Sequence, residues 1–183
     1  MITMFTQSLR LLLIAAASLL LMVGCNQADN SESSLASQAL GTDKLAQQAA
    51  PALPDLQLET LEGRSAHLSA YVGTPVVLNL WATWCPPCRR EMPVLEQAQT
   101  VFPDVAFVLV NQGESAQQAK AFLESEGLNL TDVLLDPTSE AMATMRTGGL
   151  PTTFFFNAQG RMVDVHLGEI TMAELEDKIS RHF

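Results

Sequence analysis

Cysteine, histidine and tyrosine are scarce in this chain of 183 residues, which has three Cys, three His and one Tyr. A structural zinc site needs about four Cys or His ligands, usually supplied as two close pairs. Only Cys85 and Cys88 form such a pair, because the histidines stand singly and Cys25 lies far upstream. The residue after Cys88 is Arg89, whereas covalent haem attachment requires a histidine there. These absences argue against a zinc or haem site, and no metal or organic cofactor is expected.

Basic residues are also few, since 10 Lys and Arg stand against 20 Asp and Glu, for a net charge of −10. An acidic chain repels phosphate backbones and anionic lipid headgroups. The composition therefore argues against nucleic acid, or an anionic lipid surface, as a partner.

The first 24 residues have the features of a secretory signal peptide. Arg10 is the sole positive charge, and it precedes an apolar run, Leu11 to Val23, that is too short for a comfortable membrane span. The run ends in a motif that resembles a bacterial lipobox, in which the cysteine is lipidated and becomes the mature N-terminus: Leu21-Met22-Val23-Gly24-Cys25. Met22 departs from the usual Leu, Val or Ile, and an ordinary cleaved signal with an incidental cysteine is the alternative. Lipidation of Cys25 also accounts for the odd cysteine.

The part of the chain after the signal peptide divides by composition into two segments. Residues 25–52 are rich in Ser, Gln and Ala without a sustained apolar period, which indicates a flexible tether. Residues 53–183 remain, enough for one domain with one core. We expect a lipid-anchored domain of the bacterial cell envelope that faces the periplasm.

The most informative motif follows the apolar run Pro75 to Leu80 and reads Trp84-Cys85-Pro86-Pro87-Cys88. An apolar strand followed by this motif places two thiols at the first turn of a helix, where free N–H groups and the helix dipole stabilise a thiolate. Cys85 is therefore the expected nucleophile and Cys88 the resolving thiol. A purely structural disulfide is the alternative.

At these residues the sequence resembles the TlpA/ResA/DsbE-like thiol:disulfide oxidoreductases of the bacterial envelope, a branch of the thioredoxin superfamily. Four segments between about residues 53 and 183 carry the resemblance, in the order and spacing of the family: Leu78 to Pro93, Asn111 to Ser115, Gly149 to Phe154, and Asn157 to Gly160.

The resemblance implies an α/β thioredoxin fold with a central mixed sheet, helices on both faces and an N-terminal β-hairpin extension. The pattern of apolar residues and turn residues agrees with this fold. Strands are predicted at 56–61, 65–68, 76–80, 105–110, 133–135, 152–157 and 161–167. Helices are predicted at 88–100, 115–126 (with Ser115 as N-cap), 138–147 and 171–181.

The resemblance also implies roles for residues around the cysteines. Pro151 is expected to be cis and to face the disulfide, and the backbone of Leu150 to pair with an extended substrate chain. Trp84 is expected to flank Cys85. Glu91 matches the acidic residue that tunes the thiols in the family, although a Glu in the first turns of a helix is also favoured by the dipole alone. Glu114 matches a second family Glu near the site.

Two further positions bear on the chemistry. Asn79 stands where thioredoxins have a buried Asp, so a proton relay would have to use Glu91, Glu114 or water. Pro86 and Pro87 lack the N–H groups that would otherwise stabilise a Cys85 thiolate, which favours a reducing couple nearer thioredoxin than DsbA. Arg89 and Arg90 would oppose this effect if they faced the sulfur.

The sequence therefore predicts a membrane-anchored reductase of protein disulfides, expected to be monomeric and recharged by a DsbD-like membrane reductant. Cytochrome c biogenesis is one expected setting, and other oxidoreductases or copper-site proteins remain open as substrates. A disulfide-binding or chaperone-like module without turnover, and a thiol peroxidase, are the alternatives. Against a peroxidase, Cys85 follows Ala-Thr-Trp rather than a Thr-Pro-x-x-Cys setting.

Overall fold

The computed structural model describes residues 50–183. The predicted signal peptide, the predicted lipidation site Cys25 and most of the predicted tether lie outside these residues. Within the described part of the chain, no helix has the length and apolar character needed to cross a membrane.

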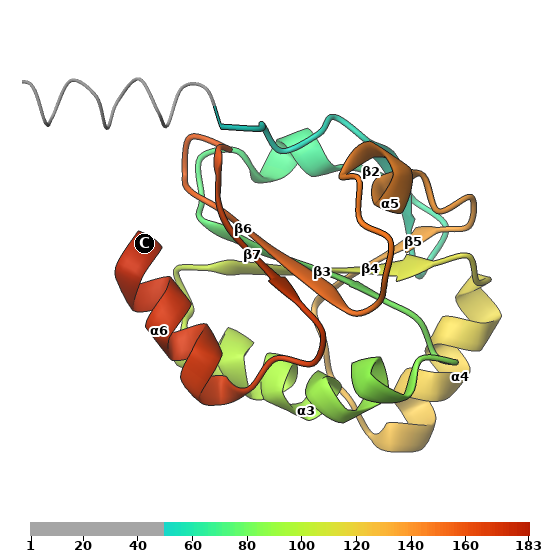
Figure 1. The fold of residues 1–183 in the computed structure, drawn as a ribbon. Helices are drawn as coiled ribbons and strands as arrows, with labels where there is room; N and C mark the ends of the chain where they lie inside the picture. The colour runs from blue at the N-terminus through green and yellow to red at the C-terminus, as the bar shows by residue number, and fades with distance from the viewer. Residues whose placement is uncertain (1–49) are drawn as a thin grey trace, which may run out of the picture. The chain divides into compact units, whose positions relative to one another are not determined.

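A seven-stranded mixed sheet forms the centre of the described residues, with the strand order β2-β1-β5-β4-β3-β6-β7 (Figure 1). The three central neighbours β5, β4 and β3 are parallel, and every other pairing is antiparallel. The strands are β1 (Gln57–Thr60), β2 (Ser65–His67), β3 (Val76–Trp81), β4 (Ala106–Gln112), β5 (Asp132–Asp136), β6 (Thr152–Phe156) and β7 (Met162–Leu167). The mixed sheet and the N-terminal hairpin β1–β2 confirm the predicted fold class.

Helices cover both faces of this sheet. The long helices α3 (Pro86–Val101), α4 (Ala116–Glu126) and α6 (Met172–His182) pack on one face, and the short helices η1 (Leu68–Tyr71) and α5 (Glu140–Thr144) on the other. Each face has its own core of buried apolar side chains. Trp81, Met92 and Phe155 belong to the first core, and Leu80 and Phe156 to the second.

Strand β3 lies between these two cores, so all six of its side chains are buried. This agrees with its sequence Val-Val-Leu-Asn-Leu-Trp, because a strand covered on both faces reads as a continuous apolar run. Asn79 is the one polar member. The strand ends four residues before Cys85 and therefore sets where the cysteine motif begins.

The start of α3 and the extent of α5 differ from the predictions. Helix α3 begins at Pro86 rather than Cys88, since proline is tolerated in the first turn, where its missing N–H would have no partner inside the helix. The predicted helix 138–147 is only five residues long, because Ser139 and Arg146 adopt left-handed φ angles of 57° and 55° at its two sides. The sequence analysis also missed the short helix η1.

Helix α4 begins at Ala116, with Ser115 as its N-cap residue as predicted. The Ser115 hydroxyl accepts from the Gln118 N–H, and the Gln118 side chain accepts from the Ser115 N–H, which completes a capping box. The helix ends at Gly127, whose φ of 67° is readily adopted by a residue without Cβ.

The chain enters the described domain beside the turn between β6 and β7. Ala52 forms a β-bridge with Arg161, and the Met162 N–H donates to the Pro51 carbonyl at 2.8 Å. This turn lies at the end of the sheet opposite the cysteine motif, because β6 is antiparallel to β3 and pairs its last residue, Phe156, with Val76. Residues 50–52, at the end of the predicted tether, are thus attached far from the cysteines.

Candidate active site

Cys85 and Cys88 form a disulfide at the N-terminus of α3, with 5.3 Å between their Cα atoms. Cys85 is the N-cap residue of this helix, and Cys88 lies in its first turn. Both residues are nearly inaccessible to solvent, with exposed fractions of 3% and 0%. The predicted pair therefore exists, and only Cys85 retains any exposed surface through which a substrate could approach.

Few hydrogen-bond donors face the sulfur of Cys85. The Cys88 N–H donates to Cys85 Sγ at 3.3 Å, whereas Pro86 and Pro87, between the two cysteines, have no N–H. Arg89 forms an ion pair with Glu126 at 2.8 Å, and Arg90 forms one with Glu169. Both arginines thus have carboxylate partners of their own, which weakens the opposing effect raised from the sequence.

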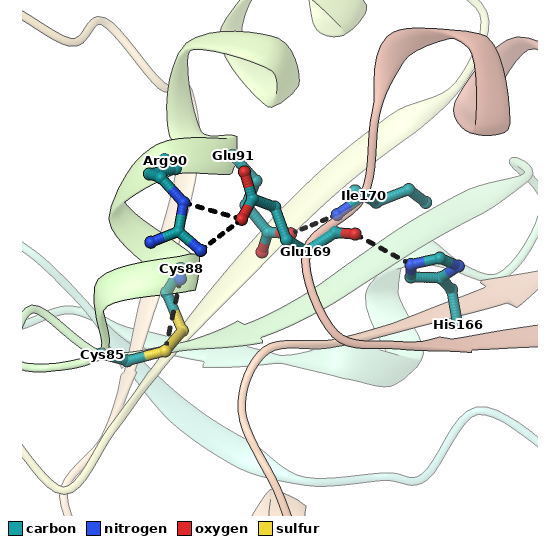
Figure 2. Close-up of polar contacts among 7 residues, drawn as sticks. All are labelled: Cys85, Cys88, Arg90, Glu91, His166, Glu169 and Ile170. Carbon is teal, nitrogen blue, oxygen red and sulfur yellow. Dashed lines mark hydrogen bonds and ion pairs between the residues drawn. A yellow bond between two sulfur atoms is a disulfide. The ribbon is translucent and has the colours of Figure 1, made fainter.

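Glu91 lies one helical turn beyond Cys88 and is completely buried (Figure 2). Its Oε1 accepts a hydrogen bond from Asn79 Nδ2 at 2.8 Å, and its Oε2 accepts one from the Ile170 N–H at 2.9 Å. Burial raises the pKa of Glu91 to about 7, although both hydrogen bonds favour the carboxylate and oppose the shift. A group with such a pKa can accept or release a proton near neutral pH.

An ion pair and a loop cover Glu91 from the outside. The Arg90 guanidinium contacts Glu169 Oε2 through Nη2 at 2.6 Å and Nε at 2.8 Å. His166 Nε2 lies 3.1 Å from the Glu169 carbonyl oxygen. Figure 2 shows Arg90 on α3, His166 on β7 and Glu169 on the loop that leads from β7 to Ile170. The Glu169 carboxylate also raises the pKa of Glu91, because two like charges disfavour each other.

The second acidic candidate, Glu114, is also buried but is placed differently. Its Oε2 accepts hydrogen bonds from the Thr83 N–H and from Asn111 Nδ2, both at 2.7 Å, and its Oε1 accepts one from the Thr83 hydroxyl. The carboxyl ends of the parallel neighbours β3 and β4 meet at the same edge of the sheet, which brings these groups together. Glu114 therefore anchors the backbone two residues before Cys85.

Two of the three predicted substrate-contact residues, Trp84 and Leu150, line one pocket together with Met142 of α5. The peptide bond between Leu150 and Pro151 is cis, as predicted. Trp84 is 67% exposed and lines, together with Leu150, Gln112 and Met142, a pocket of about 480 Å³. An exposed indole next to a pocket gives an incoming chain an apolar surface to contact. The roles of Trp84, Leu150 and Pro151 in substrate binding stay predictions.

Three residues around Glu91 escaped the sequence analysis, namely Thr153, Glu169 and Ile170. Thr153 stands opposite Asn79 in the register of β3 and β6, and its hydroxyl accepts from Asn79 Nδ2 at 2.9 Å. A local sequence pattern cannot predict which residues stand opposite each other in two strands that are more than seventy residues apart in the chain. Ile170 contributes its backbone N–H, which every residue type except proline would supply.

Among residues 50–183, no three Cys, His, Asp or Glu side chains are close enough together to hold a metal ion.

Comparisons with known proteins identify the family. The model of the AhpC/TSA family matches residues 49–165. The thioredoxin-like protein YneN of Bacillus subtilis is 37% identical over 130 residues, which cover 69% of this chain and 75% of YneN. The thiol-disulfide oxidoreductase ResA of Bacillus subtilis is 36% identical over 126 residues, which cover 68% of this chain and 70% of ResA. The chain belongs to the AhpC/TSA family and groups with its ResA-like thiol-disulfide oxidoreductases.

Solved structures agree with this family. The structure of MTB dsbF in its mixed oxidised and reduced forms superposes with a TM-score of 0.67 at 27% sequence identity. The match covers 74% of this chain and all of dsbF. The thioredoxin fold, the family and the Cys85–Cys88 pair together make this ResA-like protein a thiol-disulfide oxidoreductase.

The two prolines between the cysteines generate the first prediction. An N-cap side chain accepts hydrogen bonds from the second and third helical residues, here Pro87 and Cys88. Pro87→Ala restores the missing donor and stabilises the Cys85 thiolate. Because a hydrogen bond to a charged group contributes about 1.5–3 kcal/mol, the reduction potential should become about 30–60 mV less negative. Equilibration with glutathione measures the potential, and thiolate absorbance against pH measures the Cys85 pKa.

Pro86→Ala is the matched control, since its restored N–H belongs to the first helical residue and does not face the N-cap side chain. It should move the potential less than Pro87→Ala does. Equal shifts in the two variants, or a more negative potential in Pro87→Ala, would contradict the role assigned to the missing donor.

The buried carboxyl of Glu91 generates a second prediction. Its folded-state pKa of about 7 exceeds the usual 4.5, so between these values the folded protein binds more protons than the unfolded chain. Stability should therefore fall as the pH rises from about 4.5 to about 7, by about 3 kcal/mol from this group alone. Urea denaturation of the oxidised protein across this range should show the loss in the wild type and a smaller loss in Glu91→Gln. An unchanged pH dependence in the variant would show that Glu91 does not titrate in this window.

Proposed function

We propose that this protein is a membrane-anchored reductase of protein disulfides in the bacterial cell envelope. The observation that carries the proposal is the Cys85–Cys88 disulfide at a helix N-terminus with the buried Glu91 carboxyl one turn beyond it. In the reduced protein, the Cys85 thiolate attacks one sulfur of a substrate disulfide. A mixed disulfide forms, and the other substrate sulfur leaves as a thiolate.

Resolution of the mixed disulfide requires the thiolate of Cys88. Glu91, as a carboxylate, accepts the proton of the Cys88 thiol, and the resulting thiolate attacks Cys85 Sγ. The second substrate thiolate leaves, so the substrate has gained two electrons and the Cys85–Cys88 disulfide has formed again. A carboxyl with a pKa of about 7 suits this step because it both accepts and releases protons at neutral pH.

The surface beside the disulfide supports an extended protein chain as the substrate. Trp84 and Leu150 line one pocket, and Pro151 follows Leu150 and directly precedes β6. A substrate strand that pairs with the backbone of Leu150 gains affinity without a required sequence, while the pocket receives one side chain. This arrangement favours disulfides in unfolded or flexible segments.

The reducing direction is supported by the scarcity of donors at Cys85 Sγ. Only the Cys88 N–H donates to it among the described residues, and Arg89 and Arg90 pair with carboxylates instead. A poorly stabilised thiolate makes the dithiol a better electron donor. The oxidised protein must then be recharged, and a DsbD-like membrane reductant of thiol-disulfide chemistry is the proposed source of electrons.

The anchoring is supported by the leader and by where the chain enters the domain. A lipid on Cys25 would leave residues 26–49 between the membrane surface and the first described residue. The chain then joins the domain at the β6–β7 turn, at the opposite end of the sheet from Cys85. Attachment at this end leaves the disulfide accessible to partners on the periplasmic side.

The two cysteines should have separable roles. Cys85→Ser should abolish insulin reduction, because no thiol remains that can begin the attack. Cys88→Ser should attack once and accumulate as a mixed disulfide, since resolution requires the second thiol. Insulin turbidity and mass spectrometry of trapped adducts measure the two outcomes. Comparable turnover in both variants would contradict the assigned roles, and a wild type that binds unfolded chains without turnover would indicate a binding module.

The anchor should be separable from the redox site. Cys25→Ala should release the protein from the membrane fraction into the soluble periplasm, because the lipid is attached to this side chain. The purified variant should keep wild-type insulin reduction, since the lipid has no part in the thiol chemistry. Cell fractionation measures the first outcome. A variant that stays in the membrane fraction would indicate an uncleaved apolar segment as the anchor.

A further inference from the structure

The side-chain amide of Asn79 lies between two buried groups that can each exchange roles as hydrogen-bond donor and acceptor. Its Nδ2 donates to Glu91 Oε1 at 2.8 Å and to Thr153 Oγ1 at 2.9 Å. All three residues are buried, with exposed fractions of 1% or less. The other end of the amide, Oδ1, is buried and has no hydrogen-bond partner.

The observed orientation of the amide matches the ionised state of Glu91. A carboxylate can only accept, so it requires the Nδ2 end of Asn79 to face it. A neutral carboxylic acid whose Oε1–H points at Asn79 is a donor there, and it would then face a second donor, Nδ2. The Oε2 atom offers no such conflict, because the Ile170 N–H donates to it in both states.

We propose that Asn79 is a positioning residue for Glu91 whose side-chain amide rotates by half a turn whenever Glu91 gains or loses its proton. In the rotated state Asn79 Oδ1 accepts from the Glu91 carboxylic acid and from the Thr153 hydroxyl, which turns from acceptor to donor. No covalent bond in Asn79 or Thr153 changes. The only transfer is the proton, which comes from Cys88 during turnover or from water in the resting oxidised protein.

The rotation conserves the number of hydrogen bonds. Asn79 makes two in the observed state and two in the rotated state. The end of the amide that points away has no partner among the described residues, and that end is Oδ1 in one state and Nδ2 in the other. An amide with a fixed partner at its far end would have to break that bond to rotate. Because this end has no partner, the rotation breaks no hydrogen bond there.

The rotation links the protonation of Glu91 to β6, the strand that directly follows the predicted substrate-contact residues Leu150 and Pro151. Thr153 follows Pro151 by two residues on β6 and pairs with Asn79 across the sheet. The Thr153 hydroxyl on this strand thus changes from hydrogen-bond acceptor to donor when Glu91 gains its proton. The functional consequence rests on the proposed reductase activity, in which Glu91 receives the Cys88 proton, whereas the rotation itself requires no substrate.

Several other ionisable groups lie near Glu91, and their effect on Asn79 must be distinguished from the effect of Glu91. Glu169 carries a like charge and is paired with Arg90, and the oxidised cysteines do not titrate. The imidazole of His166 contacts the Glu169 carbonyl oxygen through Nε2. His166→Gln is therefore the matched control, because it removes the ionisable imidazole and keeps a polar side chain on β7.

Nuclear magnetic resonance of the isotope-labelled, oxidised full chain tests the proposal. Above the Glu91 titration, the Asn79 amide protons should show nuclear Overhauser effects to the side chains of Glu91 and Thr153. Below it, these effects should disappear with the same midpoint as the Glu91 carboxyl carbon shift, in both the wild type and His166→Gln. Effects that persist on both sides of the Glu91 titration would overturn the rotation.

Glu91→Gln provides a second test without titration. The Ile170 N–H requires an acceptor, so the variant amide must turn its oxygen to Ile170 and its NH₂ group to Asn79. Asn79 should then present Oδ1 and show the low-pH pattern at every pH. The high-pH pattern in this variant would contradict the proposal. Because neither experiment uses a substrate, insulin reduction by the wild type tests the proposed function independently.

Discussion

A carboxylic acid buried in the core imposes the main constraint on this site, because the fold has to supply its hydrogen bonds. Glu91 belongs to α3, its first donor to β3 and its second donor to the loop before α6. The two donors do not fully replace water, so the pKa stays raised to about 7. The environment that sets the pKa of Glu91 therefore depends on three elements, namely α3, β3 and the loop before α6.

The second buried acid, Glu114, accepts more hydrogen bonds than Glu91 does. Glu114 accepts three hydrogen bonds: two from Thr83 tie it to the segment between β3 and Cys85, and the third comes from Asn111 on β4. One acid thus holds the backbone that leads into the cysteine motif, and the other lies one turn beyond the motif in α3. In the proposed mechanism Glu91 exchanges protons with Cys88, whereas Glu114 holds the backbone before Cys85.

Much of this architecture could be predicted from local patterns. The apolar run of β3, the capping box at Ser115 and the alternation in the β1–β2 hairpin depend on residues close together in the chain, where periodicity and side-chain chemistry act directly. The predicted helix 138–147 was too long, because the backbone turns left-handed at Ser139 and Arg146, two residue types whose side chains do not signal it. The sequence also left open whether the two arginines after Cys88 face the Cys85 sulfur. In the structure they form ion pairs with Glu126 and Glu169.

The sequence by itself determined the cysteine pair at a strand-to-helix junction and the two prolines that withhold N–H donors, because each depends on neighbouring residues. It also indicated the fold class, through four segments that resemble the family. It also placed Glu91 one turn after Cys88, since helical spacing is local. Only the tertiary structure decided that Glu91 is buried and that Asn79, Thr153 and Ile170 surround it. Those contacts join segments from β3, β6 and the loop before α6, and their register is set by the packing of the whole sheet rather than by any short stretch of sequence.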